Sequence, residues 1–220
     1  MREKGTFAIG VLASVFYPVT WLFARRTTRG LENIPREGAA LVVLNHPSYI
    51  DPIIDAISIH EYGRIPRFFT KHTLWKIPVL GRVLDGAGQI PVFRGTSKAG
   101  DSLRGADAAL RDGKVVVIYP EGTLTSDPDG WPGAGRTGVA RLALANDVPV
   151  IPAAKWGTKE ILDSRRRRFR PFPPKRVRML VGEPVDLSAY RDRPVDRELL
   201  GEVTEVVMAR VRELLKEIRD

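Results

Sequence analysis

A histidine and an aspartate five residues apart make the segment 45–52 (Asn-His-Pro-Ser-Tyr-Ile-Asp-Pro) the first candidate for chemistry in this sequence. If the turn between them brings the side chains together, Asp51 can fix the tautomer of the His46 imidazole and stabilise its protonated form. The other ring nitrogen can then act as a general base. A purely structural interpretation stays open, because Asp51 followed by Pro52 is also a favourable helix start.

A second polar turn follows the residues 114–119 (Lys-Val-Val-Val-Ile-Tyr), whose β-branched side chains predict a strand. In the turn, Pro120 and Gly122 suit a type I β-turn in which Glu121 is merely solvated. Alternatively, the turn presents a carboxylate, backbone N–H groups and the Thr123 hydroxyl at the sheet edge that carries His46.

Two further segments could contact a substrate. Residues 88–94 end in Arg94, whose planar guanidinium can bind a phosphate through two hydrogen bonds, although such an arginine, taken alone, is more often a surface residue. Residues 148–154 are apolar, and could form either core or a wall for an acyl chain.

The elements that must position these residues alternate along the chain. Continuous apolar runs predict strands covered on both faces, and periodic segments between them predict helices. The tail 196–219 has apolar residues on one helical face and should pack against the sheet. We therefore predict a single α/β domain with a mostly parallel or mixed sheet flanked by helices. The predicted strands are 39–44, 67–70, 114–119, 149–154 and 177–181, and the predicted helices are 52–59, 98–111, 138–145 and 196–219.

The N-terminal residues 5–24 contain no charged side chain, and Arg25 and Arg26 follow directly. About 20 apolar residues can cross a bilayer as a helix, but Pro18 should kink a helix or end it near Tyr17. We therefore predict two short helices lying partly within one leaflet, in a membrane-associating segment 1–28 that precedes an α/β domain at 29–220. A buried N-terminal helix and a cleaved signal peptide are the alternatives.

The charge and composition narrow the class of partner. The net charge is +9 and the pI is about 10.1, so anionic partners are favoured. The chain has no cysteine, which excludes thiolate nucleophiles and disulfides, and its three histidines have no metal-binding spacing, so no metal is predicted.

The basic run 165–170 could be a solvated loop, a contact with anionic lipid headgroups or a site for the phosphates of coenzyme A. Lipid is favoured over nucleic acid, because an apolar N-terminal segment supplies a second anchoring signal.

Taken together, these segments resemble a known family. Residues 45–51 resemble the NHxSxxD block of the glycerolipid acyltransferases, the 1-acylglycerol-3-phosphate acyltransferase group. Residues 119–123 resemble the FPEGT block, and residues 88–94 and 148–152 are similar to the second and fourth blocks. The resemblance extends from about Gly30 to Ala154, and the first and third blocks are specific in combination.

The resemblance implies an activity and a role for each residue. A base, here His46 with Asp51 as its partner, would remove the proton of a lysophospholipid hydroxyl, which attacks an acyl thioester; the expected product is phosphatidic acid. The co-substrate would be acyl-CoA or an acyl carrier protein thioester, with no permanently bound cofactor, at the cytoplasmic face of a membrane with anionic lipids. The acceptor would be held by Arg94, Glu121, Gly122 and Thr123, and the loop would be supported by Asn45 and Ser48.

One departure affects the expected acceptor. The family usually carries arginine after Glu-Gly-Thr, whereas this chain has Leu124. A replacement cation could come from Lys71, Lys98 or Arg136. The acceptor could also be a glycolipid or another lysolipid, and a non-enzymatic basic membrane adaptor is a further alternative.

Overall fold

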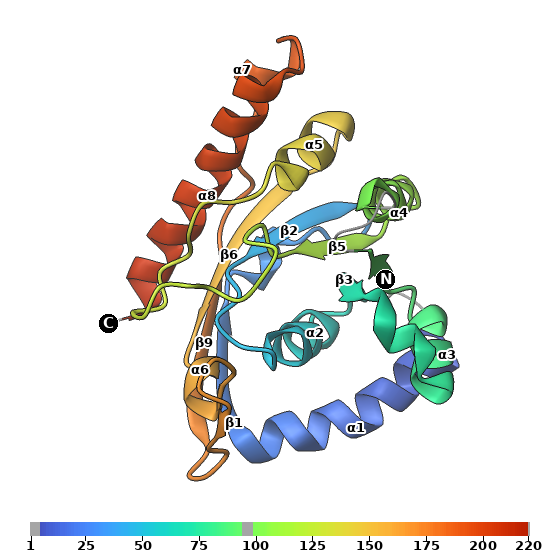
Figure 1. Ribbon diagram of the computed structural model, residues 1–220, viewed down its shortest axis with the longest axis vertical. Coiled ribbons are helices and arrows are strands. Elements are labelled where there is room, and N and C mark those ends of the chain that lie inside the picture. Colours follow the sequence, from blue (N-terminus) through green and yellow to red (C-terminus); the bar gives the residue numbers. More distant parts are fainter. Residues whose placement is uncertain (1–4, 94–98, 220) are drawn as a thin grey trace.

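The computed structural model describes residues 5–93 and 99–219, which form an α/β fold around one central sheet (Figure 1). The strand order is β1-β9-β6-β2-β5-β3-β4. Neighbouring strands are parallel except for β6 and β9, which are antiparallel, so the sheet is mostly parallel and mixed, as predicted. The strands are β1 Ala24–Arg29, β2 Ala40–Leu44, β3 Pro66–Lys71, β4 Ile90–Val92, β5 Val115–Ile118, β6 Val150–Trp156 and β9 Lys175–Val181.

Helices cover both faces of this sheet (Figure 1). On one face lies α2 (Asp51–Glu61), with α1 (Phe7–Phe23) crossing its outer side and reaching α3 (Pro78–Gly86). The other face carries α4 (Ala99–Arg111), α5 (Gly138–Ala145) and α8 (Arg197–Arg219). The remaining elements are short: η1 Leu31–Asn33, η2 His72–Lys76, α6 Thr158–Ile161, α7 Ser188–Arg191 and a hairpin of β7 Leu162–Asp163 with β8 Arg168–Phe169.

The central strand β2 is buried on both faces, as its continuous apolar run predicts. Leu41 and Val43 join the cluster beneath α4, α5 and α8, while Val42 and Leu44 join the cluster beneath α2. Each such side chain contributes about 1.5–3 kcal/mol through burial. This double cover fixes the strand register, and with it the direction in which the chain leaves β2 at residue 45.

The tail helix α8 packs against the sheet, as its amphipathic pattern predicts. It lies along β6 and β9, and its apolar face is buried. The other predicted strands and helices also form, with ends that differ by a few residues. The buried apolar residues of α8 are Leu199, Leu200, Val203, Val207, Met208, Val211, Leu215 and Ile218.

The prediction of two short N-terminal helices was wrong, because α1 is one helix with Pro18 inside it. Proline removes one backbone hydrogen bond, but contacts with other elements hold the helix at this point. Tyr17 Oη lies 2.9 Å from His60 Nδ1, with the two rings edge to face. In the described part of the chain, no helix combines the length and apolarity needed to cross a membrane. The predicted division at residue 28 runs through β1, an edge strand of the sheet.

Candidate active site

The parallel strands β2 and β5 are neighbours, so their carboxyl ends place residues 45 and 119 at one edge of the sheet. Asn45, which is fully buried, fixes the chain at this exit. Its Nδ2 donates to the Lys155 carbonyl oxygen at 3.0 Å, and its Oδ1 accepts from the Lys155 backbone N–H at 2.9 Å. The Asn45 side chain thus joins β2 to β6 immediately before His46.

The structure brings His46 and Asp51 into contact, with His46 Nδ1 lying 2.9 Å from Asp51 Oδ2. The same carboxylate oxygen accepts from the Ser48 backbone N–H at 2.8 Å. The Asp51 side chain is 0% exposed and that of His46 is 13% exposed. Because Nδ1 faces the carboxylate, Nε2 is the ring nitrogen left to face a substrate.

The remainder of this loop is anchored to residues that follow β6. Ser48 Oγ donates to the Leu162 carbonyl oxygen at 2.7 Å, and the Tyr49 backbone N–H donates to Ser164 Oγ at 2.9 Å. Ser48 is fully buried. Its hydroxyl therefore fixes the loop rather than facing a substrate.

Glu121 connects the second turn to the histidine loop. Its Oε1 accepts from the His46 backbone N–H at 3.1 Å and from Thr125 Oγ1 at 2.7 Å, while Oε2 accepts from the Gly133 backbone N–H at 3.3 Å. The Thr125 backbone N–H in turn donates to the His46 carbonyl oxygen at 2.8 Å. The alternative of a merely solvated Glu121 is wrong, since the residue is buried and holds the two turns together.

The turn itself closes through a 2.9 Å hydrogen bond from the Gly122 N–H to the Tyr119 carbonyl oxygen. Gly122 has φ +67° and lies under a side chain: a Cβ there would be 2.7 Å from Arg136 Nε. Thr123 is exposed, whereas Leu124 is buried. Arg136 is therefore a cation beside the predicted acceptor-binding turn.

Of the other predicted cations, the structure describes only Lys71. Lys71 is exposed at the end of β3. Arg94 and Lys98 lie outside the described residues. In the fourth predicted segment, Val150 and Ile151 are core residues on opposite faces of the sheet.

Three residues that were not predicted complete the site. The Tyr119 ring stacks on the His46 imidazole, with centroids 4.2 Å apart and planes 8° from parallel. Tyr119 Oη donates to Asp55 Oδ2 at 2.6 Å. Lys155 Nζ forms an ion pair with the same Asp55 oxygen and lies 3.9 Å from Asp51 Oδ2.

All three side chains are titratable; Lys155 and Asp55 are fully buried, and Tyr119 is partly buried. Burial raises the pKa of Asp55 above its ordinary value, and the nearby Asp51 carboxylate adds to this effect, while the Lys155 cation opposes it. Burial, together with the Asp55 and Asp51 carboxylates, also raises the pKa of Tyr119 well above its ordinary value. Both effects favour the protonated forms of these two side chains.

The sequence contained a signal for two of the missed residues. Asp55 follows Asp51 by four positions, which places both on the same face of a helix. Lys155 follows Ile151 and Ala153 in alternation on β6, so it points to the face that carries α2. The predicted segment ended at residue 154, one position too early to include it.

Comparison with known proteins identifies the family of this chain. The acyltransferase family model matches residues 25–156, which is more than half of the chain. The protein therefore belongs to the acyltransferase family.

Similar proteins have names within that family. The chloroplastic 1-acyl-sn-glycerol-3-phosphate acyltransferase of Brassica napus is 31% identical over 164 residues, covering 73% of this chain and 45% of that protein. The 1-acyl-sn-glycerol-3-phosphate acyltransferase of Bacillus subtilis is 25% identical over 186 residues, covering 83% and 84%. This chain thus spans less than half the length of the Brassica relative but most of the bacterial one.

A solved structure has the same fold. The 1-acyl-sn-glycerophosphate (LPA) acyltransferase PlsC of Thermotoga maritima superposes with a TM-score of 0.71 at 28% sequence identity. The match covers 94% of this chain and 79% of the other.

Proposed function

We propose that this protein transfers a fatty acyl group from a coenzyme A or acyl carrier protein thioester to the free hydroxyl of a lysophospholipid. The acceptor that fits best is 1-acylglycerol-3-phosphate, the substrate in the names of the Brassica and Bacillus relatives. The observation that carries the proposal is the 2.9 Å contact between His46 and Asp51, at the sheet edge where the Glu121 turn also lies.

In the proposed reaction His46 acts as a general base. Its Nε2 accepts the proton of the acceptor hydroxyl as the oxygen attacks the thioester carbonyl carbon. The new C–O bond forms, the C–S bond breaks, and the proton passes from the imidazolium to the departing sulfur, which leaves as a thiol. The Asp51 carboxylate stabilises the imidazolium between these steps, and such a base contributes about 10²–10⁴-fold to the rate.

The acceptor phosphate would be held beside the Glu121 turn. Arg136 lies over Gly122, and its guanidinium can donate two hydrogen bonds to a phosphate. It would supply the charge that Leu124 does not. Arg94, whose role rests on the resemblance, would contribute a second contact.

A thiol-release assay with purified protein and palmitoyl-CoA tests this proposal. The acceptors are 1-acylglycerol-3-phosphate, lysophosphatidylcholine, monoacylglycerol and a glycolipid. We expect thiol release that depends on acceptor, with the highest kcat/KM for the phosphate monoester, and an Arg136→Ala variant should raise KM for that acceptor alone. Transfer to none of these alcohols, or to monoacylglycerol as fast as to the phosphate monoester, would overturn the assignment of the acceptor.

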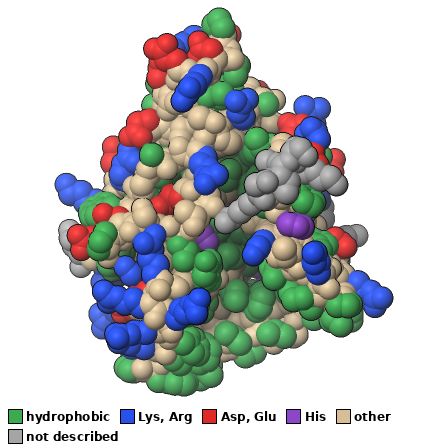
Figure 2. Space-filling view, viewed as in Figure 1, with side chains coloured by type: hydrophobic (Ala, Val, Ile, Leu, Met, Phe, Trp, Pro, Cys, Tyr) green, Lys and Arg blue, Asp and Glu red, His purple; other side chains and the backbone are tan. Residues whose placement is uncertain are grey.

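The proposed reaction takes place at a lipid surface, and α1 presents a face suited to one. Phe7 is 90% exposed and Trp21 is 80% exposed, and Val15 and Leu22 are also exposed on this helix. Figure 2 shows hydrophobic side chains gathered along the edge of the molecule that α1 forms in Figure 1. A tryptophan beside exposed apolar side chains is typical of a segment lying in the headgroup region.

The hairpin of β7 and β8, which contains the basic run 165–170, lies against the carboxyl end of this helix. The Phe23 ring packs edge to face on Phe169 and Phe172, with each pair of centroids 5.6 Å apart. A groove of about 510 Å³ between Trp21 and Phe172 is also lined by Arg25 and Arg26. Apolar and basic side chains thus share one surface, as binding to an anionic membrane requires.

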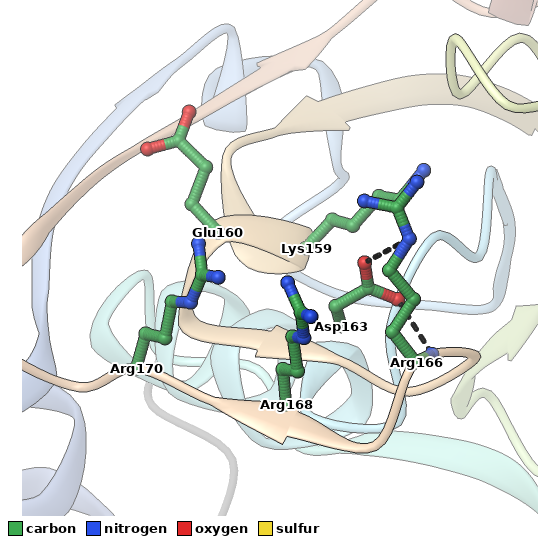
Figure 3. Close-up of a pocket in the computed structure, with 6 residues that line it drawn as sticks. All are labelled: Lys159, Glu160, Asp163, Arg166, Arg168 and Arg170. Atoms are coloured by element: carbon green, nitrogen blue, oxygen red, sulfur yellow. Dashed lines mark hydrogen bonds and ion pairs between the residues drawn. The ribbon is translucent and has the colours of Figure 1, made fainter.

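The hairpin has its own small pocket of about 100 Å³ (Figure 3). Arg168 and Arg170 extend side by side there, next to Asp163, which pairs with Arg166. Four cations and two carboxylates line this pocket: Lys159, Arg166, Arg168, Arg170, Glu160 and Asp163. We include the pocket in the proposed membrane surface, as a site for lipid phosphate groups.

Vesicle sedimentation tests whether this hairpin, rather than the overall positive charge of the protein, binds anionic lipid. Replacing Arg168 and Arg170 with glutamine should weaken binding to phosphatidylglycerol vesicles, since each basic residue near an anionic membrane contributes about 1 kcal/mol. The matched control removes the same charge from α8, by changing Arg210 and Arg212 to glutamine. Equal losses in the two variants, or equal binding to phosphatidylcholine vesicles, would contradict the proposed surface.

A further inference from the structure

Lys155 is the largest fully buried side chain of the described residues, and its position is unusual for a cation. It lies on β6 among apolar residues, on the sheet face that α2 covers. Removing an ammonium group from water is costly unless opposite charges surround it. Two carboxylates do so here, because Asp55 forms the ion pair and Asp51 Oδ2 is 3.9 Å away.

Two routes connect this pair to the proposed base. Asp51 Oδ2 faces both Lys155 Nζ, at 3.9 Å, and His46 Nδ1, at 2.9 Å. Asp55 Oδ2 accepts from Tyr119 Oη, and the Tyr119 ring stacks on the imidazole. The ion pair therefore lies directly behind the reactive histidine, although neither of its members contacts the solvent-facing side of the ring.

We propose that Lys155 and Asp55 are positioning residues that set the pH range in which His46 can act as a base. The Lys155 cation attracts the Asp51 oxygen that His46 also contacts, while the Asp55 carboxylate offsets that charge. The balance between them decides how strongly Asp51 stabilises the imidazolium. The kinetic part of this inference rests on the proposed acyl transfer.

Further titratable groups lie near the ion pair and the histidine. The loop after β2 contributes the Tyr49 ring, which lies edge to face on the imidazole. Glu121 reaches His46 only through the backbone N–H. Among residues 5–93 and 99–219, the groups that face the pair or the base are Asp51 from α2, Tyr119 from the end of β5, His46 and Tyr49 from the loop after β2, and Glu121 from the turn.

The two members of the pair should have opposite effects on the pH profile. In a Lys155→Met variant, buried Asp55 loses its cation and takes up a proton, so Asp51 stabilises the imidazolium without competition. The acid limb of kcat/KM should move to higher pH. In an Asp55→Asn variant, the uncompensated ammonium is drawn to Asp51, and the acid limb should move to lower pH. We expect each shift to be about one pH unit, as for a charge change near a titrating group.

A double variant keeps the test decisive if Lys155→Met does not fold. Asp55→Asn combined with Lys155→Met has no buried ion pair, so its acid limb should lie at higher pH than that of the wild type. Charge removal elsewhere provides the control. Arg193→Met and Glu202→Gln break an exposed ion pair on the far side of the sheet and should leave the profile unchanged.

Proton NMR titration of the His46 imidazole, assigned with a His46→Gln variant, gives the same comparison without turnover. The pH at which the imidazole gains its proton should move in opposite directions in Asp55→Asn and in the double variant. Shifts in the same direction, or no shift in either variant, would overturn the proposal. Opposite NMR shifts in a protein that transfers no acyl group would uphold this inference and reject the proposed function.

Discussion

The two faces of the central sheet carry different kinds of buried side chain. Beneath α4, α5 and α8 the strands present aliphatic residues such as Leu41 and Val116. Beneath α2, the same strands present aliphatic residues along most of their length, but Lys155 faces Asp51 and Asp55 near the sheet edge. One face is thus a mainly aliphatic core, whereas the other combines core with a charged cluster.

This difference indicates that the α8 face mainly stabilises the fold, whereas the α2 face carries the residues proposed for chemistry. Aliphatic burial stabilises the fold in proportion to the area removed from water. A buried ion pair gives little net stability, because desolvation of the two charges offsets their attraction. We therefore expect substitutions on the α8 face chiefly to change the free energy of unfolding, and substitution of Asp51, which lies beside the buried ion pair, chiefly to change turnover.

The largest expected effect is on turnover, in an Asp51→Asn variant. The asparagine oxygen can still accept from the Ser48 N–H, so the loop should keep its shape, but a neutral amide cannot stabilise the imidazolium. We expect kcat for acyl transfer to fall about 10²–10⁴-fold, with a nearly unchanged urea midpoint. A variant that keeps wild-type kcat, or one that unfolds, would contradict the expectation that Asp51 affects turnover while the α8 face affects stability.

A Leu215→Ala variant on α8 tests the opposite face. Leu215 is fully buried against Ala154 and Leu180. Removing its side chain should lower the free energy of unfolding by about 2–5 kcal/mol, as measured by urea denaturation. Turnover per folded molecule should stay at the wild-type level, and a fall in kcat matching that of Asp51→Asn would contradict the account.

The smallest expected effect concerns Tyr119 at alkaline pH. Its pKa is raised well above the ordinary 10.0, so the native state keeps a proton that the unfolded state loses. The stabilisation is complete below pH 10 and declines as pH rises toward the folded pKa, by about 1.4 kcal/mol per pH unit. In Tyr119→Phe the decline above pH 10 should be shallower, as measured by urea denaturation between pH 9 and 11; equal slopes would show that the buried phenol does not contribute.

The sheet and its covering helices could be predicted because their signal is local. The continuous apolar run at 39–44 and the helical spacing at 196–219 each depend on a few neighbouring residues, and both elements form. The break predicted at Pro18 failed for the opposite reason. Contacts of α1 with α2 and α3, including Tyr17 against His60, keep the helix continuous there.

The candidate site was predictable only in part. His46 and Asp51 belong to one turn, so spacing alone could place them together. Lys155 and Asp55 are 100 residues apart, and their pairing depends on β6 lying beside β2 in the sheet order. Spacing within a short segment contains no information about that neighbour.

The most direct test of the account is a single-turnover measurement of acyl transfer by His46→Ala, with 1-acylglycerol-3-phosphate and palmitoyl-CoA. The His46 side chain is partly exposed and contacts Asp51 through Nδ1. The fold should therefore survive the removal of the imidazole. The account predicts that the variant binds vesicles like the wild type while its rate falls about 10²–10⁴-fold. Transfer at the wild-type rate would show that His46 is not the base.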